Sequence, residues 1–116
     1  MRKIEVWQGK TLLAGDVEIA DRFFNRFRGL MLRKTLPSGS GLLLKNCSDI
    51  HCFFMRFPID AVYISRVMTV VGLERVEPWH IGRHFRGAKH VLELPAGGSA
   101  GIEPGMILEL KERRSI

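Results

Sequence analysis

Apolar and polar residues alternate along much of this chain. Successive side chains of a β-strand point to opposite faces, so this alternation is typical of half-buried strands. The first stretch, residues 2–8, alternates in this way, and Gly9-Lys10 is a two-residue turn signal before a second apolar run over residues 11–14. These features predict a β-hairpin, with residues 17–20 extending or following its second strand.

Further strands are predicted where β-branched and apolar residues gather between turn signals. They are expected over residues 42–44, 61–64, 68–77, 91–94 and 106–111, with a β-bulge at Gly72. A helix is predicted near residues 21–28, where Asp21 is suited to the N-cap and phenylalanines recur at helical spacing. The expected fold is α+β and mostly β: a compact antiparallel barrel-like or sandwich domain with one short helix.

Composition places the chain among ordinary globular proteins, with 46% hydrophobic and 26% charged residues in a length of 116. That length predicts a single domain over residues 1–116. No apolar run approaches the roughly 20 residues that a membrane helix needs, and no secretory signal is visible. A cytoplasmic location is therefore expected, with Cys47 and Cys52 as free thiols.

Positive charge is unevenly distributed in this basic chain, whose net charge is +6 and whose pI is near 9.9. No acid occurs from Arg22 to Ser48, or again from Trp79 to His90. Two such blocks favour a surface for phosphate or carboxylate. They also permit RNA or DNA binding if aromatic side chains are exposed for stacking. The alternative is that they form a solvated basic face.

The densest chemistry lies in residues 47–60. Thiol, imidazole and thioether groups there are donors that suit Cu(I) or Zn(II); they belong to Cys47, His51, Cys52 and Met55. Their spacing matches no zinc motif, and the period of a strand separates the two cysteines, which also argues against a cysteine nucleophile activated by histidine. We predict no metal, no cofactor and no catalytic residue. The stretch is interpreted as a β-strand that turns through Pro58, with a new strand beginning at Asp60.

The favoured interpretation is a noncatalytic binding module for a small anionic or polar ligand or for a protein segment. Guanidinium groups suit carboxylate and phosphate, and one cleft is predicted to combine Arg28, Arg33, His51, Arg56, Asp60 and Glu93. Asp60 has a simpler alternative role, which is to accept backbone N–H groups of a turn. Two other functions stay open: a small hydrolase or metal-dependent enzyme using His51 with Cys47 or Asp60, and nucleic-acid binding through the basic face.

A series of short motifs runs through the chain. They are Arg28-Gly-Leu-Met-Leu-Arg33, Leu36, Gly41-Leu-Leu-Leu44, His51-Cys-Phe-Phe-Met-Arg-Phe-Pro-Ile-Asp60, Val76-Glu-Pro-Trp79, Val91-Leu-Glu-Leu-Pro-Ala-Gly97 and Gly101-Ile-Glu-Pro-Gly105. Each motif alone is weak, but their order resembles the domain of unknown function family 192, a set of small prokaryotic proteins. The resemblance implies a compact, mostly β fold with a small helical part, and it implies no reaction.

The chain departs from that family's pattern at three places. Met106 stands where an acid usually follows the last glycine, and Gly41-Leu-Leu-Leu44 replaces a strand that usually carries phenylalanine. The turn Ser65-Arg66-Val67-Met68 replaces one that usually carries Asp-Gly. A site that depends on acids in those turns is therefore not expected in this chain.

Overall fold

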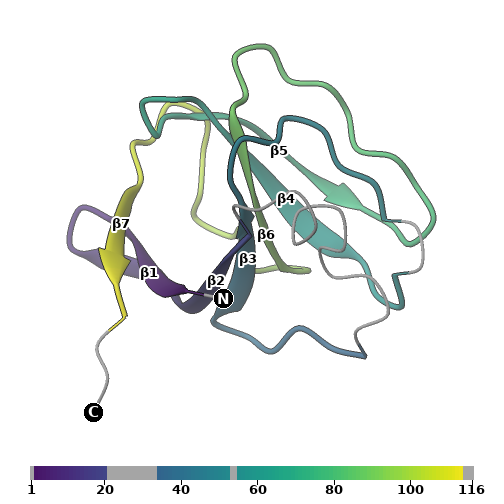
Figure 1. The fold of residues 1–116 in the computed structure, drawn as a ribbon, viewed down its shortest axis with the longest axis horizontal. Helices are drawn as coiled ribbons and strands as arrows, with labels where there is room; N and C mark the ends of the chain where they lie inside the picture. The colour runs from purple at the N-terminus through teal and green to yellow at the C-terminus, as the bar shows by residue number, and fades with distance from the viewer. Residues whose placement is uncertain (1, 21–33, 53–54, 114–116) are drawn as a thin grey trace.

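A seven-stranded sheet forms the framework of the computed structural model, which describes residues 2–20, 34–52 and 55–113 (Figure 1). Its strands are β1 (Lys3–Gln8), β2 (Thr11–Ala20), β3 (Ser40–Leu44), β4 (Ile59–Ile64), β5 (Val70–Val76), β6 (His90–Pro95) and β7 (Glu109–Glu112). Their order across the sheet is β5-β4-β6-β3-β2-β1-β7. Within the described residues no helix is long and apolar enough to cross a membrane.

The predicted β-hairpin is confirmed as β1 and β2, which pair in antiparallel fashion. Ile4 and Val6 alternate into the core, and Gly9 adopts the positive φ of 58° that a tight turn requires. The second strand, β2, runs without a break as far as Ala20. It therefore includes residues 17–20, which were predicted either to extend or to follow the strand at residues 11–14. Its continuation is explained by Val17, which is fully buried and holds the distal half against the core.

Strands were also correctly expected around β3, β4, β5 and β6, and the bulge predicted at Gly72 is confirmed. Tyr63 pairs with Gly72, whereas its neighbour Ile64 pairs with Val70, so one residue of β5 is extra. Gly72 also allows a close approach, because a Cβ atom there would overlap the Phe85 ring. β4 lies between β5 and β6, and all six of its residues are buried.

The mostly β class is confirmed, but the prediction of an antiparallel, barrel-like or sandwich domain needs correction. β2 and β3 are parallel, and a parallel pair requires a long crossover connection, which the chain from residue 21 to residue 39 supplies. The sheet is not a closed barrel, because β5 and β7 remain its two ends. An isolated bridge between Thr69 and Ile107 joins the segments that lead into β5 and β7. The helix predicted at 21–28 lies outside the described residues.

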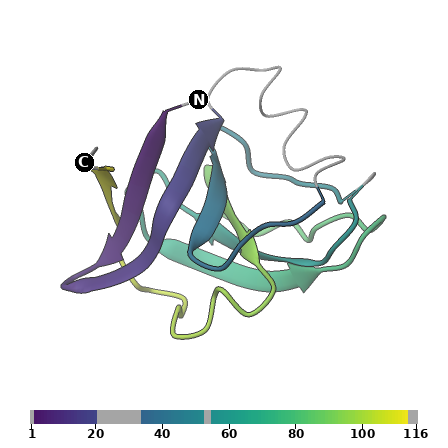
Figure 2. The same cartoon turned by 90° about the horizontal axis from the view of Figure 1, so that it is seen from below.

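The sheet bends strongly, so the β1–β2 hairpin stands at a steep angle to β4 and β5 (Figure 2). Its inner face holds one core cluster to which strands from both ends contribute, including Val6 of β1 and Val70 of β5. Its outer face holds a second cluster, covered by loops that supply Ile50, Cys52 and Met55. Bending thus gives a small chain two apolar layers from one sheet.

The stretch at residues 47–60 is not the strand that its composition predicted. Within its described residues, His51 makes an isolated bridge to Ile81, and β4 begins at Ile59. Cys52 and Met55 are both buried in the outer cluster. Because these two residues are three positions apart, a regular strand would send their side chains to opposite faces. Here Met55 N–H donates to Cys52 O at 3.3 Å, and both side chains lie in the outer cluster.

Candidate functional site

Asp60 is a buried carboxylate that fastens a turn to the sheet. It accepts hydrogen bonds from Gly97 N (3.0 Å), Ser99 N (3.2 Å) and Ser99 Oγ (2.6 Å), and from Arg75 Nε (3.1 Å). Burial by itself would raise the pKa of this carboxyl. The bonds from Ser99, Arg75 and Gly97 outweigh that effect, so the pKa is lowered. The alternative role proposed for Asp60, accepting backbone N–H groups of a turn, is confirmed.

Glu93 lies on the other face of the sheet from Asp60. Asp60 pairs with Leu94 across β4 and β6, and Ala61 pairs with Glu93, so the two acids occupy alternate positions. The buried side chain of Glu93 therefore shares the outer face with Tyr63, whose pKa it helps to raise. The structure thus does not bring the two predicted acids into one cleft.

A part-buried phenol–carboxylate contact was missed by sequence reasoning. Tyr63 Oη donates to Glu74 Oε2 at 2.7 Å, and the same oxygen accepts Arg83 N–H at 2.6 Å. Burial, followed by the bond to Glu74, raises the pKa of Tyr63 well above its usual value. The Phe85 ring lies 4.5 Å from the Tyr63 ring, centroid to centroid. This set fixes the loop after β5 onto the sheet, and the only available signal was the alternation that turns Tyr63 and Glu74 to the same face.

The two thiols have environments that disfavour nucleophilic chemistry. Cys52 is fully buried, and burial, with Glu93 as the next cause, raises its pKa to about 12. The thiol therefore stays protonated near neutral pH. Cys47 is half-buried, and its thiol donates to Asp49 O at 3.1 Å. Among the described residues, no group of three or more His, Cys, Asp or Glu side chains is placed to hold a metal ion.

The most distinctive exposed chemistry lies on the loop between β5 and β6, residues 77–89, called here the basic loop. From Pro78 to Lys89 it contains no acid, and its exposed cationic or titratable side chains are His80, Arg83, His84, Arg86 and Lys89. It also exposes two large apolar side chains, Trp79 (58%) and Ile81 (70%). In Figure 1 this loop, in green, runs along the upper right of the sheet.

The backbone of the basic loop is held at several points. Trp79 N donates to Cys52 O at 2.7 Å, and Gly82 N donates to Ile50 O at 3.0 Å. Lys89 N donates to Ile64 O at 2.8 Å near the far end. A Cβ atom at Gly82 would lie 2.5 Å from Tyr63 Oη, so this residue must be small for the loop to lie so close. The loop is therefore a fixed platform.

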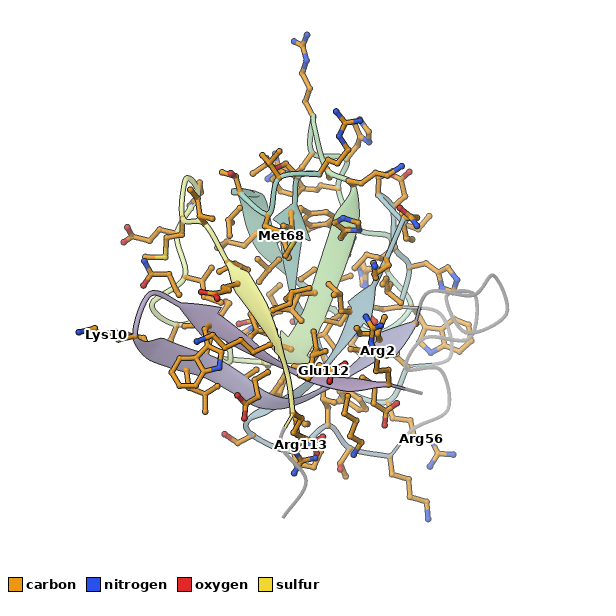
Figure 3. The ribbon with its side chains drawn as sticks, turned by 60° about the vertical axis from the view of Figure 1, so that its left-hand side comes forward. Arg2, Lys10, Arg56, Met68, Glu112 and Arg113 are labelled. Atoms are coloured by element: carbon orange, nitrogen blue, oxygen red, sulfur yellow. The ribbon has the colours of Figure 1, made fainter. Side chains whose placement is uncertain are left out.

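The predicted site residues are dispersed. His51 is half-buried and forms a bridge pair with Ile81, which places it beside the basic loop. Arg56 is exposed and points away from the strands in Figure 3. Arg28 and Arg33 lie outside the described residues. Of the four predicted residues that the structure describes, it places only His51 at the basic loop.

Comparison with known proteins agrees with this fold. A UPF0127 protein of Thermococcus sibiricus is 38% identical, with 97% of this chain and 75% of that protein aligned. The corresponding figures for a UPF0127 protein of Pyrococcus furiosus are 34%, 91% and 95%. For a UPF0127 protein of Thermococcus kodakarensis, 31% identical, the chain spans only 59% of the relative's length.

Two solved structures share the fold at low sequence identity. A protein of unknown function from Novosphingobium aromaticivorans has a TM-score of 0.80 and 20% identity, covering 92% of this chain and 83% of that one. A putative transcription regulator from Sinorhizobium meliloti has a TM-score of 0.74 and 23% identity, covering 94% and 92%. The family model DUF192, described as an uncharacterized ACR, matches residues 4–110. The chain therefore belongs to the DUF192 family of uncharacterized proteins.

Proposed function

We propose that this protein is a noncatalytic binding module that holds an anionic ligand on the basic loop. The observation that carries the proposal is a fixed run of backbone, residues 78–89, that presents exposed Arg83, Arg86 and Lys89 without an acid among them. Guanidinium and ammonium groups in such an arrangement attract carboxylate and phosphate. Among the described residues, three acids lie close to this run: Glu77 precedes it, Asp49 pairs with His84 at 3.3 Å, and half-buried Glu74 accepts Arg83 N–H.

Rigidity of the platform favours binding. A ligand that meets a mobile loop must order it, and that ordering reduces affinity. Here the hydrogen bonds from Trp79, Gly82 and Lys89 to neighbouring segments already hold the backbone. The bond from Arg83 N to Glu74 holds its centre. The cationic side chains are thus presented at little further entropic cost to their backbone.

The noncatalytic part of the proposal is supported by the states of two reactive groups, Cys52 and Asp60. The Cys52 thiol is buried and protonated, and Asp60 is engaged by Gly97, Ser99 and Arg75. A nucleophile or general base needs a group that reaches substrate in the right protonation state. Cys52 and Asp60 lack that access, so the hydrolase alternative gains no support from them.

The test compares charge reversal on the loop with matched reversal elsewhere. Melting temperature is measured with inorganic phosphate, citrate and polyglutamate for wild type, for Arg86→Glu with Lys89→Glu, and for Lys10→Glu with Arg66→Glu. Lys10 and Arg66 are exposed in turns remote in sequence, and Figure 3 shows Lys10 at the tip of the β1–β2 hairpin. Both double variants change the net charge equally.

An anion that raises the melting temperature of wild type and of the Lys10/Arg66 variant, but not of the Arg86/Lys89 variant, is the expected result. If both double variants lost the anion-induced shift in melting temperature equally, only net charge would matter, and the proposal would be wrong about the loop. If no anion shifted the melting temperature of wild type, the proposal would be refuted. Added salt is expected to weaken the effect because exposed charges are screened.

Nucleic-acid binding at the same loop is the second candidate, favoured by the exposed Trp79 side chain in a loop that also exposes cations. The Sinorhizobium meliloti protein of the same fold is described as a putative transcription regulator. This candidate predicts that affinity for single-stranded DNA falls steeply as salt is added. The logarithm of the binding constant should fall linearly with the logarithm of the salt concentration. Failure of purified protein to bind DNA at low salt would remove it.

A further inference from the structure

We infer that the ligand of the basic loop is an acidic protein segment that carries an aliphatic or aromatic anchor residue. The inference rests on the proposed function and deepens it by naming the partner's chemistry. Its starting point is the apolar pair Trp79 and Ile81, which are 58% and 70% exposed within three consecutive residues. Single exposed apolar side chains are common and need no explanation. Two of them on a fixed backbone, next to a run of cations, form a mixed surface.

The backbone of Trp79 supports a functional interpretation of its position. Its φ is 66°, in the left-handed region that bulky residues rarely adopt. Trp79 N donates to Cys52 O at 2.7 Å in this conformation, so neighbouring structure maintains it. Strained residues of this kind cluster at active sites, ligand clamps and switch regions. The outlier therefore points to a role for the exposed indole.

Ile81 shares its surface with His51, because the two residues form a bridge pair. Their neighbours Ile50 and Cys52 are buried, so the alternation along this short ladder directs His51 and Ile81 to the other side. Ile81 thus lies at the outer side of a rigid two-segment ladder. An aliphatic group of a partner gains burial there without disturbing the outer core cluster.

The chemistry of this surface fits a polypeptide better than a nucleic acid. An oligonucleotide binds through aromatic platforms and phosphate contacts; besides Trp79 the loop's other large aromatic side chain is Phe85, whose ring is packed on that of Tyr63 at 4.5 Å between centroids, and His80 and His84 supply only small rings. Ile81 offers no stacking face. An acidic peptide uses both parts: its apolar residue packs on Trp79 and Ile81, and its carboxylates meet Arg83 and Arg86.

Chain geometry gives an upper limit to the length of the segment. Ile81 and Arg86 are five residues apart, which allows a separation of at most about 17 Å at roughly 3.3 Å per residue. A partner of five or six extended residues spans that distance. The expected segment therefore has one apolar residue followed by several Asp or Glu residues.

Trp79 itself provides the signal for the test. The protein has two tryptophans, and Trp7→Phe leaves Trp79 as the only one in the chain. The probes are two acetylated synthetic peptides of equal charge, Leu-Gly-Asp-Glu-Asp-Glu and Ser-Gly-Asp-Glu-Asp-Glu, and an eight-nucleotide oligothymidylate. Affinities are obtained from the change in Trp79 emission and checked by calorimetry.

The leucine peptide is expected to bind about tenfold more tightly than the serine peptide, as burial of one aliphatic side chain predicts. Ile81→Ser should remove most of that difference and leave the serine peptide unaffected, whereas Arg86→Glu with Lys89→Glu should weaken both peptides. Far-ultraviolet circular dichroism confirms that each variant is folded.

The possible failures separate the inference from the proposed function. Equal binding of the two peptides to wild type would overturn the inference and leave an anion-binding module. Preference for oligothymidylate over both peptides would assign the surface to nucleic acid and also overturn it. Absence of binding by every probe, together with no thermal shift by inorganic phosphate, citrate or polyglutamate, would overturn both.

Discussion

Replacing Asp60 by asparagine tests whether this buried carboxylate fastens the turn after β6. The substitution keeps the size of the side chain but removes its charge and one acceptor oxygen. Three hydrogen bonds from Gly97 and Ser99 then lose a charged acceptor, and each such bond contributes about 1.5–3 kcal/mol. Gly97 is exposed, so water satisfies part of what is lost.

The ion pair with Arg75 adds little to this sum, because the arginine side chain is more than half exposed. Exposed pairs contribute about 0–1 kcal/mol. Allowing for water at Gly97 and for non-additivity, we expect Asp60→Asn to lower the free energy of unfolding by about 2–4 kcal/mol at pH 7. Asp16→Asn is the matched control, since Asp16 pairs only with exposed Lys3 and Arg113 cations among its described contacts, and its expected effect is below about 1 kcal/mol.

The pH dependence gives this prediction its sharpest form. The pKa of Asp60 is lowered by folding, so its stabilising contribution is fully present above the unfolded-state value of about 3.9. The contribution is lost as pH falls through the lowered folded-state pKa. Urea unfolding of wild type and Asp60→Asn should therefore differ most at neutral pH and converge toward pH 2. A difference that stays constant over this range, or one no larger than that of Asp16→Asn, would refute the reasoning.

Three further predictions concern a close glycine contact, the two thiols and a buried histidine. Gly72→Ala forces the Phe85 ring to move, and overpacking of this kind should lower the free energy of unfolding by about 1–3 kcal/mol in urea titration; an unchanged midpoint would show that the ring is free to shift. A thiol reagent should label Cys47 in the native protein and Cys52 only with unfolding, since the Cys52 thiol is buried and its pKa is raised; equally fast labelling would contradict this. His90 has a lowered pKa because of burial and nearby lysines, so its neutral form is favoured in the fold and stability should fall as pH drops below about 6.5. His90→Gln should flatten the thermal-stability profile between pH 7.5 and 5, and a profile with the same slope would exclude this residue as its cause.

Strand positions were predictable because alternation and turn chemistry are local properties. The β1–β2 hairpin was predicted from the alternation of apolar and polar residues around Ile4 and Val6 and from the turn signal at Gly9. The bulge at Gly72 followed from a glycine within a β-rich run. Pairing is not local, and the parallel contact of β2 with β3 gave no signal in either strand alone. The strong bend that creates two apolar layers is likewise a property of the whole sheet.

The candidate site was harder to predict for the same reason. Asp60 and Glu93 were predicted to line one cleft with arginines and His51, but the register of β4 with β6 places the two acids on opposite faces. The stretch at 47–60 looked like a strand because of its β-forming residues, and the structure uses them to cover the outer face. The basic loop was visible as a block without acids. That its backbone is fixed to Cys52, Ile50 and Glu74 was not predictable, because those contacts join distant parts of the chain.

The loops that cover the outer face of the sheet bury some side chains in the core and expose others to solvent. Two isoleucines on paired segments show the difference. Ile50 is 5% exposed in the outer cluster, whereas Ile81 on the paired segment is 70% exposed. Ile50→Ala leaves a cavity and should lower the free energy of unfolding by about 2–5 kcal/mol. Ile81→Ala removes no core contact and should change it by less than about 0.5 kcal/mol. Denaturant unfolding of the two variants compares the same chemical change on adjacent segments. A large loss with Ile81→Ala would place that side chain in the core, whereas the expected small change leaves its exposed position to be explained by what binds there.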